Sequence, residues 1–260
     1  MKFTLRILKW ISLGLLGLIL LLFLFLLLDR GAIERPAPPP PSEIKAPPVY
    51  SADVDLNLYN TLLEQFGKHK SLAEGYELQC LLALSHYPEL KEVPIDFVIQ
   101  ETFIPLASRP APISVLFPWV KRKYLVVISS KSADFFEGIL MHNLPFNEQV
   151  GVLGHELAHS LFYLDKNSFQ LAWIAYQYEK NGDFHDRFEQ DTDKRAVAHG
   201  LGYQLYDYAF FVRKSFGNTQ EEIANEEGGT YLSPKELAAE MEQYPFYRDT
   251  LRSPDTYFVD

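Results

Sequence analysis

The chain begins with one long apolar stretch. Residues 7–28 are almost all Leu, Ile, Phe, Trp or Gly, and none is charged from residue 10 onward. About 20 such residues are enough for a helix to cross a membrane. A cleaved signal peptide has a shorter apolar core followed by a small-residue cleavage site, which Asp29-Arg30-Gly31-Ala32 does not offer. We therefore expect residues 1–30 to form an uncleaved transmembrane signal anchor.

A proline-rich segment follows the anchor. It contains Pro36, an unbroken proline run over 38–41, and the pair Pro47-Pro48. Proline fixes φ and lacks an N–H, so this segment is unsuited to a regular helix or sheet. We expect residues 31–49 to be a semi-rigid polyproline linker that holds a domain, residues 50–260, away from the membrane.

The first half of that domain mixes two periodicities. Apolar positions recur at helical spacing in Leu56–Phe66 and in residues 72–84, which predicts two helices. Short runs rich in β-branched and aromatic residues follow at Ile95–Gln100, 113–117 and Tyr124–Ser129. Such runs are typical of strands, so we expect a small mixed sheet.

The second half is predominantly helical. Asn147 is expected to cap a helix over residues 150–163, with Glu148 in its first turn. Further helices are predicted over residues 169–180, ending at the turn Asn181-Gly182, over 184–211 with a possible interruption at 200–202, and over 233–243. The expected fold class is α+β, helix-rich, with the small sheet before the helix of residues 150–163.

Charge and cysteine content exclude some classes of protein. The formal net charge is −10, and the longest basic cluster is Lys121-Arg122-Lys123, so a nucleic-acid partner is not expected. Cys80 is the only cysteine, which excludes an intramolecular disulfide and a cysteine-based zinc site within one chain. Its apolar surroundings predict a buried, unreactive thiol.

The strongest chemical signal is His155-Glu156-Leu157-Ala158-His159. On a helix, two histidines four residues apart project from one face and can reach one metal ion. Glu156 is rotated by about 100° from His155, which follows from 3.6 residues per turn, so its carboxylate lies beside the metal. From there it can take a proton from water that zinc activates. Packing of both histidines without a metal is disfavoured, because they would be buried without partners.

A catalytic zinc site needs a third protein ligand and one open position. Asp165 has the spacing found in metzincins, but Phe162 stands where those proteins need a glycine, and Met241 falls in a predicted helix rather than in a Met-turn. Glu189 is the better candidate, because 29 residues separate it from His159 and allow the chain to return antiparallel. Asp193, one turn later, can orient a ligand histidine.

These two motifs together resemble the gluzincins, the zinc peptidases that include thermolysin and the CAAX prenyl proteases. The resemblance covers residues 147–202 and implies a zincin-like fold, Zn²⁺ ligands at His155, His159 and Glu189, and Glu156 as base. It also implies an edge strand that holds an extended peptide, at Tyr124–Ser129 or at residues 140–144. The exopeptidase motif of gluzincin aminopeptidases is missing, which favours an endopeptidase.

Gluzincins also use a His or Tyr to stabilise the oxyanion of the reaction intermediate. The candidates downstream of Glu189 are His199, Tyr203 and Tyr206, and the sequence does not choose among them. His142, just before the motif helix, is a further candidate to support a metal ligand.

The expected partners are a peptide or protein substrate and, through residues 7–28, a membrane. Lys2, Arg6 and Lys9 precede the apolar stretch, which predicts a cytoplasmic N-terminus and a periplasmic or equivalent extracytoplasmic domain. Two alternatives remain at this stage. One is a non-catalytic zinc protein that binds a partner, and the other is a zinc amidase acting on cell-wall material. Nothing in the sequence indicates an oligomeric state.

Overall fold

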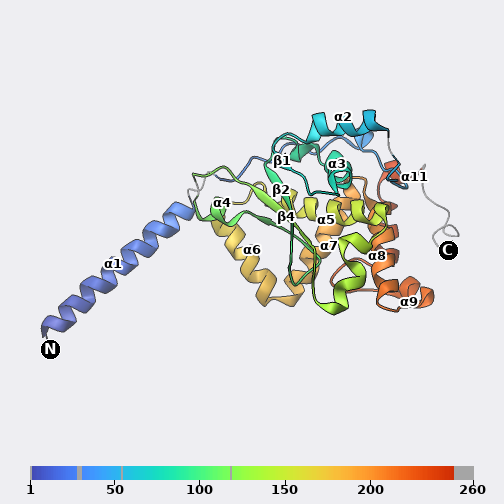
Figure 1. The fold of residues 1–260 in the computed structure, drawn as a ribbon. Helices are drawn as coiled ribbons and strands as arrows, with labels where there is room; N and C mark the ends of the chain where they lie inside the picture. Colours follow the sequence, from blue (N-terminus) through green and yellow to red (C-terminus); the bar gives the residue numbers. More distant parts are fainter. Residues whose placement is uncertain (1, 28–30, 54, 118, 249–260) are drawn as a thin grey trace.

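A computed structural model describes residues 2–27, 31–53, 55–117 and 119–248 of the chain. Helix α1, Lys2–Leu27, projects from the body of the protein (Figure 1). Its segment Arg6–Leu24 is long and apolar enough to cross a membrane. The end of the expected anchor, residues 28–30, and the end of the expected domain, residues 249–260, lie outside the described residues.

A mixed four-stranded sheet forms one side of the body. Its strands are β1 Lys70–Ser71, β2 Ile95–Gln100, β3 Leu106–Pro110 and β4 Tyr124–Ser129, in the spatial order β1-β2-β4-β3. Strands β1, β2 and β4 are parallel, whereas β3 runs antiparallel to β4. The predicted strands β2 and β4 are confirmed, and β1 and β3 were not predicted.

Two expectations about this sheet are wrong. Residues 113–117 are not a strand: Pro112 occupies the first turn of a short helix, α4 Pro112–Leu116, and the Ser114 hydroxyl bonds to the carbonyl of Ala111. Tyr124–Ser129 is not an edge strand, because β4 lies between β2 and β3. Residues 140–144 cannot supply the edge either, because they lie in and beside two 3₁₀ turns.

Helices make up most of the remaining chain and confirm the α+β class. After α4 they are α5 Phe146–Tyr163, α6 Ser168–Lys180, α7 Gly182–Ala198, α8 Gly202–Ser215, α9 Gln220–Asn225, α10 Pro234–Met241 and α11 Pro245–Arg248; α2 Leu56–Phe66 precedes β1, and α3 Glu77–Ser85 lies between β1 and β2. Helix α5 lies centrally and packs against α3, α7, α8 and β3. Its residues 149–161 are buried on all sides, as expected of a helix inside a core.

The expected helix boundaries shift at three places. The helix over 184–211 is interrupted, because Gly200 adopts φ of +89° and ends α7. Helix α3 begins at Glu77 rather than at residue 72, after a turn in which Gly75 has φ of +81°. Asn147 does not cap α5. It lies within the helix, and its side chain accepts from the N–H of Tyr50.

The proline-rich linker packs along the domain instead of standing free. The N–H of Ile33 donates to the carbonyl of Leu164 at the C-terminal end of α5, and Ala46 is buried in the core. Near the other end of α5, Gln204 donates to the carbonyl of Pro47. The linker can pack in this way because proline keeps its carbonyl acceptor and the residues between prolines keep their donors. The packed body therefore begins at about residue 31 rather than at residue 50.

We expect Gly151→Ala to destabilise the fold. A Cβ at Gly151 would lie 2.5 Å from the backbone oxygen of Gln204 on α8, and backbone yields less easily than a side chain. Overpacking of this kind costs about 1–3 kcal/mol of the free energy of unfolding. Thermal unfolding of the full chain in detergent measures the effect. Gly182→Ala is the control, because nothing lies within 4 Å of its added Cβ, and an equal loss in both variants would contradict the proposed close contact.

Candidate metal centre

Helices α5 and α7 bring three ligand atoms together in the interior. His155 and His159 lie one turn apart on α5, and Glu189 comes from α7. The two Nε2 atoms are 3.1 Å apart, and Oε2 of Glu189 lies 3.1 Å from Nε2 of His155 and 3.2 Å from Nε2 of His159. All three side chains are buried. This nearly equilateral triangle of donors could hold a metal ion.

Asp193 fixes the orientation of His155. Its Oδ1 lies 2.8 Å from Nδ1 of His155, and its Oδ2 accepts from the backbone N–H of Leu232 at 2.9 Å. With Nδ1 engaged by a carboxylate, Nε2 is the ring nitrogen that faces Glu189. Metal-ligating histidines commonly have a carboxylate partner on the far nitrogen, which fixes the tautomer and the ring plane.

Thr192 plays the corresponding part for His159. The Thr192 hydroxyl donates to the carbonyl of Phe188 at 2.8 Å, so it is an acceptor for Nδ1–H of His159, 3.3 Å away. This arrangement assigns the proton to Nδ1 and leaves the lone pair of Nε2 for the centre. Both histidines therefore present the same nitrogen to the same point.

The second oxygen of Glu189 is also engaged. Oε1 accepts a hydrogen bond from the hydroxyl of Tyr178 on α6 at 2.7 Å. Burial would raise the pKa of Glu189, but its hydrogen bonds with His155 and His159 outweigh burial and hold the pKa well below the ordinary 4.5. Burial and the Glu189 charge keep the pKa of Tyr178 above its ordinary value, so Tyr178 remains a donor.

Glu156 lies beside this triangle and is not one of its corners. One part of its carboxylate accepts from the backbone N–H of Ser108 on β3, whereas Oε2 is buried without a hydrogen-bond partner among the described residues. Burial raises the pKa of Glu156 above the ordinary 4.5. A buried, unpartnered carboxylate oxygen next to a metal-binding cluster is a candidate proton acceptor.

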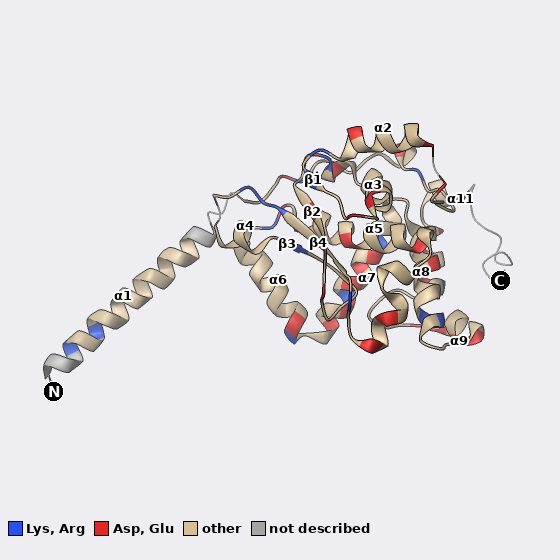
Figure 2. Ribbon diagram, viewed as in Figure 1, with Lys and Arg blue, Asp and Glu red and all other residues tan. Residues whose placement is uncertain are grey.

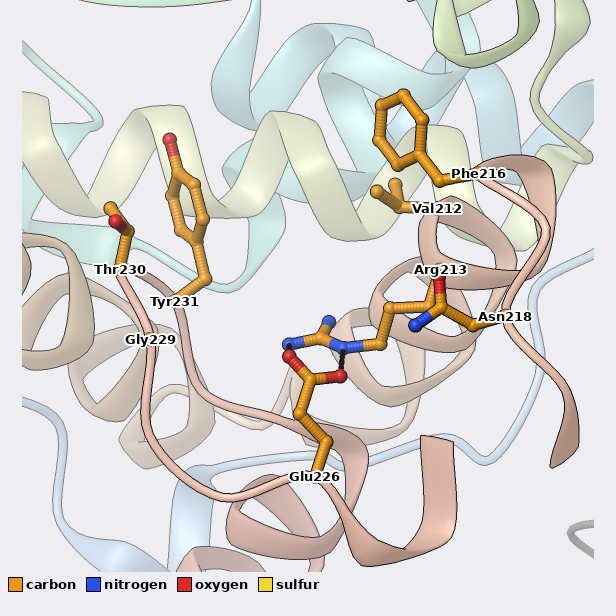
Figure 3. Close-up of a pocket in the computed structure, with 8 residues that line it drawn as sticks. All are labelled: Val212, Arg213, Phe216, Asn218, Glu226, Gly229, Thr230 and Tyr231. Carbon is orange, nitrogen blue, oxygen red and sulfur yellow. Dashed lines mark hydrogen bonds and ion pairs between the residues drawn. The ribbon is translucent and has the colours of Figure 1, made fainter. Parts of the chain in front are cut away.

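Aromatic rings enclose the centre. Phe188 stacks on His159 with centroids 5.2 Å apart, and the edge of Tyr231 meets His155 at 5.7 Å. Tyr231 also lines a cleft of about 300 Å³ between the end of α8 and the loop before α10, which Figure 3 shows. Arg213 and Glu226 form a two-bond ion pair across that cleft. The cleft therefore adjoins the His-His-Glu cluster through one shared side chain, Tyr231.

Several residues singled out in the sequence do not join the centre. Asp165, the alternative ligand, pairs with Arg35 and Lys166 near the surface. His199 is buried against Glu89 at 3.1 Å and stacks on Tyr87.

The other three candidates also have surroundings of their own. Tyr203 packs against the ring of Tyr247, and Tyr206 is buried in the core cluster. His142 pairs with Glu137 at the surface.

Sequence reasoning missed four residues that surround the cluster, namely Tyr178, Thr192, Tyr231 and Ser108. Only Thr192 had a local signal, because it lies three residues after Glu189 on the same helix and therefore on nearly the same face. The other three come from α6, from the loop before α10 and from β3. Their positions depend on how those elements pack, which no local spacing reports.

We expect Asp193→Ala to weaken metal binding by about 10–100-fold, the usual cost of removing the group that orients a ligand histidine. Titration of the full chain with Zn²⁺ or Co²⁺ in competition with a chelator measures the dissociation constant. Asp165→Asn is the matched control, because Asp165 lies outside the cluster. If Asp165→Asn weakened metal binding and Asp193→Ala left it unchanged, Asp165 would be the ligand that the chain uses.

The stability of the metal-free protein should fall as pH rises above the ordinary pKa values of Glu156, 4.5, and of His155, 6.5. Burial alone would lower the pKa of His155, but Asp193 and Glu189 outweigh it and hold the pKa well above the ordinary 6.5. The stabilisation from this raised pKa is complete below 6.5 and is lost as pH rises through the folded-state pKa. The raised pKa of Glu156 acts in the same direction above 4.5. The lowered pKa of Glu189 matters only below 4.5, where its stabilisation is lost as pH falls.

Added metal should reverse this trend, because metal binding requires His155 to lose its proton. The gain in midpoint temperature on adding Zn²⁺ should therefore widen as the pH rises. Thermal unfolding of the full chain with chelator and with Zn²⁺, across that pH range, measures both effects. A gain that shrinks with rising pH would contradict the assigned protonation of His155.

Comparison of the chain with protein-family models, with curated proteins and with solved structures finds no match. The site is therefore assigned by its own geometry: a buried His-His-Glu cluster that could hold a metal ion, with a buried glutamate beside it.

Proposed function

We propose that the chain is a zinc-dependent peptidase of gluzincin type, with a zincin-like fold and endopeptidase activity. The observation that carries this proposal is the geometry around α5. Three buried donors converge on one point, both histidines are oriented by further contacts, and a buried glutamate lies beside them with one free oxygen. A purely structural metal site would not need that glutamate.

Zinc fits the donor set. Zinc bonds to imidazole nitrogen and carboxylate oxygen are about 2.0–2.2 Å long, so two ligands of a tetrahedral zinc lie about 3.3–3.5 Å apart. The three separations here are 3.1, 3.1 and 3.2 Å. Among the described residues only these three donors meet, which leaves a fourth position for a substrate or water. Three protein ligands with one open position are typical of catalytic zinc, whereas structural zinc has four.

Bound zinc would lower the pKa of water and polarise a substrate carbonyl. The chain itself supplies the proton acceptor. Glu156 is held on one side by the Ser108 N–H and offers Oε2 to a proton from the attacking water. Because burial raises its pKa, Glu156 holds an accepted proton more readily than an exposed glutamate does, and it can then deliver that proton to the departing amine.

Strand β3 is the edge on which an extended peptide would bind. The two residues that flank β3 have odd numbers and form backbone hydrogen bonds on the β4 side. The Ser129 N–H donates to the Pro105 carbonyl, and the Ala111 N–H donates to the Lys123 carbonyl. In an antiparallel pair the intervening residues point their backbone groups away. Leu106 and Ser108 therefore direct theirs outward, and Ser108 already reaches Glu156. A substrate strand added here would pass beside the base.

Tyr231 is a further candidate for oxyanion stabilisation. Its ring lies against His155, and its side chain is about half exposed, which allows a substrate to reach it. Its position at the border of the cleft with Arg213 and Glu226 also makes it a residue that a substrate side chain would touch.

We further propose that α1 crosses the membrane with its N-terminus in the cytoplasm. The basic residues Lys2, Arg6 and Lys9 precede the uncharged part of the helix, which favours that orientation. The zinc-binding domain then lies in the periplasm or an equivalent compartment, where its substrate is a peptide or protein.

Replacing the base should separate metal binding from catalysis. We expect Glu156→Gln to keep one zinc per chain and to lose hydrolysis by about 10²–10⁴-fold, the usual contribution of a positioned general base. Zinc content is measured by mass spectrometry. Hydrolysis of a mixture of internally quenched peptides is measured with the full chain in detergent. Glu148→Gln, on the same helix but away from the centre, is the matched control and should retain activity.

The alternatives predict other results. A wild-type chain that binds zinc and cleaves peptidoglycan fragments but no peptide would be a cell-wall amidase. A chain that binds zinc and cleaves neither would be a non-catalytic zinc protein. Full peptidase activity in Glu156→Gln would show that Glu156 is not the base.

A further inference from the structure

Helix α6 carries an aromatic stripe on its outer face. Phe169, Trp173 and Tyr176 follow one another at spacings of four and three residues and are 39%, 54% and 55% exposed. The inner face, formed by Leu171, Ile174 and Tyr178, packs toward the domain. Only the last two residues of α6 are charged, and Figure 2 shows the rest of the helix without charge. Both faces of α6 are therefore apolar, which a helix bounded by water on one side does not need.

The segment around α4 extends this surface. The Ser168 hydroxyl at the start of α6 donates to the carbonyl of Val115, so α4 lies beside the N-terminal end of α6. Exposed apolar side chains cover this segment: Ile113, Leu116, Phe117, Trp119 and Val120. We call them, with the stripe on α6, the α4–α6 face. Contiguous exposed apolar surfaces of this kind are rare on soluble monomers and mark interaction sites.

The membrane helix ends at this same face. The ring of Phe23 meets the ring of Phe169 edge-on, with centroids 5.2 Å apart. Phe23 is the last but one residue of the segment Arg6–Leu24 that can cross a membrane. If that segment spans the bilayer, Phe23 lies near the outer end of the span, and Phe169 lies at a similar depth. In Figure 1, α6 runs across the direction of α1 rather than continuing it, as a helix lying along a membrane surface would.

We propose that the α4–α6 face lies in the interfacial layer of the lipid bilayer that α1 crosses. This proposal rests on α1 as a membrane span and on no part of the proposed catalysis. Tryptophan and tyrosine concentrate at membrane interfaces, where an apolar ring with a polar edge is favoured. All three tryptophans of the chain, Trp10, Trp119 and Trp173, are exposed and lie on α1 or on this face.

The charges at the rim of the face fit lipid headgroups. Lys121 is exposed two residues after Trp119, and Lys180 lies in line with the aromatic stripe at the end of α6. Lysines in such positions extend their ammonium groups to lipid phosphates while the aromatic rings stay in the interface. A second copy of the chain is a weaker fit, because α1 already places the face against lipid.

This placement would hold the metal centre at a fixed height above the membrane. Helix α6 carries the lipid-facing stripe on one face, and on the other it carries Tyr178, which donates to the metal-ligand candidate Glu189. The substrates favoured by such a geometry are chain segments that lie close to the bilayer surface. Soluble proteins that do not stay close to the bilayer surface would reach the centre less often.

Quenching of tryptophan emission by brominated lipids tests the proposal. The full chain is reconstituted in liposomes in forms that keep one tryptophan each. Trp10→Phe with Trp119→Phe leaves Trp173, and Trp119→Phe with Trp173→Phe leaves Trp10. The matched control replaces all three with Phe and adds Leu56→Trp on α2, which is 70% exposed and lies across the domain from α6 (Figure 1). We expect brominated lipid to quench Trp10 and Trp173 strongly and the α2 position hardly at all.

The other outcomes overturn the proposal in different ways. Quenching at Trp10 without quenching at Trp173 would mean that α1 spans the bilayer and the α4–α6 face does not touch it. Quenching at neither position would mean that α1 does not span the bilayer, which would overturn the proposal as well. Emission of Trp173 could also be insensitive to brominated lipid and protected from acrylamide quenching only in nanodiscs that hold several chains. In that case the face is an interface between copies. Activity of the same preparations reports separately on the proposed peptidase.

Discussion

The buried contacts between α5 and α7 are the constraint on which the rest of the site depends. His155, His159, Glu189, Asp193 and Glu156 all lie in the interior within two facing helices. An isolated buried charge costs several kcal/mol, so such a cluster persists only if its members are paired or hold a metal. The pairing here comes from α6, from the loop before α10 and from β3, through Tyr178, the Leu232 N–H and the Ser108 N–H. Satisfying the cluster thus fixes where those elements lie.

The direction of the pKa shifts shows how the cluster is charged. The pKa of His155 is raised although burial opposes it, and the pKa of Glu156 is raised by burial. The proton on His155 supplies positive charge beside the carboxylates of Asp193 and Glu189, whereas the shift of Glu156 comes from burial. A divalent cation at the triangle of donors would supply that charge and displace the proton from His155. Proton binding to His155 and metal binding are therefore alternative ways to balance the carboxylates of Asp193 and Glu189.

The parts of the site that follow from one helix could be predicted from the sequence, and the parts that depend on tertiary packing could not. His155 and His159 share a face of α5 because of helical geometry alone. Glu189 and Asp193 share a face of α7 for the same reason. Ser108 and Tyr178 carry no such signal. Residues 113–117 misled the prediction because their β-branched and aromatic residues are typical of a strand, whereas Pro112 and the buried Ser114 favour a short helix. The linker is predicted only as a semi-rigid spacer, because proline content reports backbone stiffness and not the surface against which a chain packs.

Helix α6 shows why one pattern can hide two interactions. Its inner stripe of Leu171, Ile174 and Tyr178 and its outer stripe of Phe169, Trp173 and Tyr176 together make it apolar around most of its circumference, so it lacks the strong amphipathic pattern of a surface helix. The inner stripe ends at Glu189, and the outer stripe begins at the ring of Phe23. A thirteen-residue helix is about 20 Å long at 1.5 Å per residue, so the contact with α1 and the contact with the metal-ligand candidate are at opposite ends of one rigid element. Changes in how the domain sits on α1 would therefore reach the candidate metal centre through Tyr178, without passing through the sheet or α5.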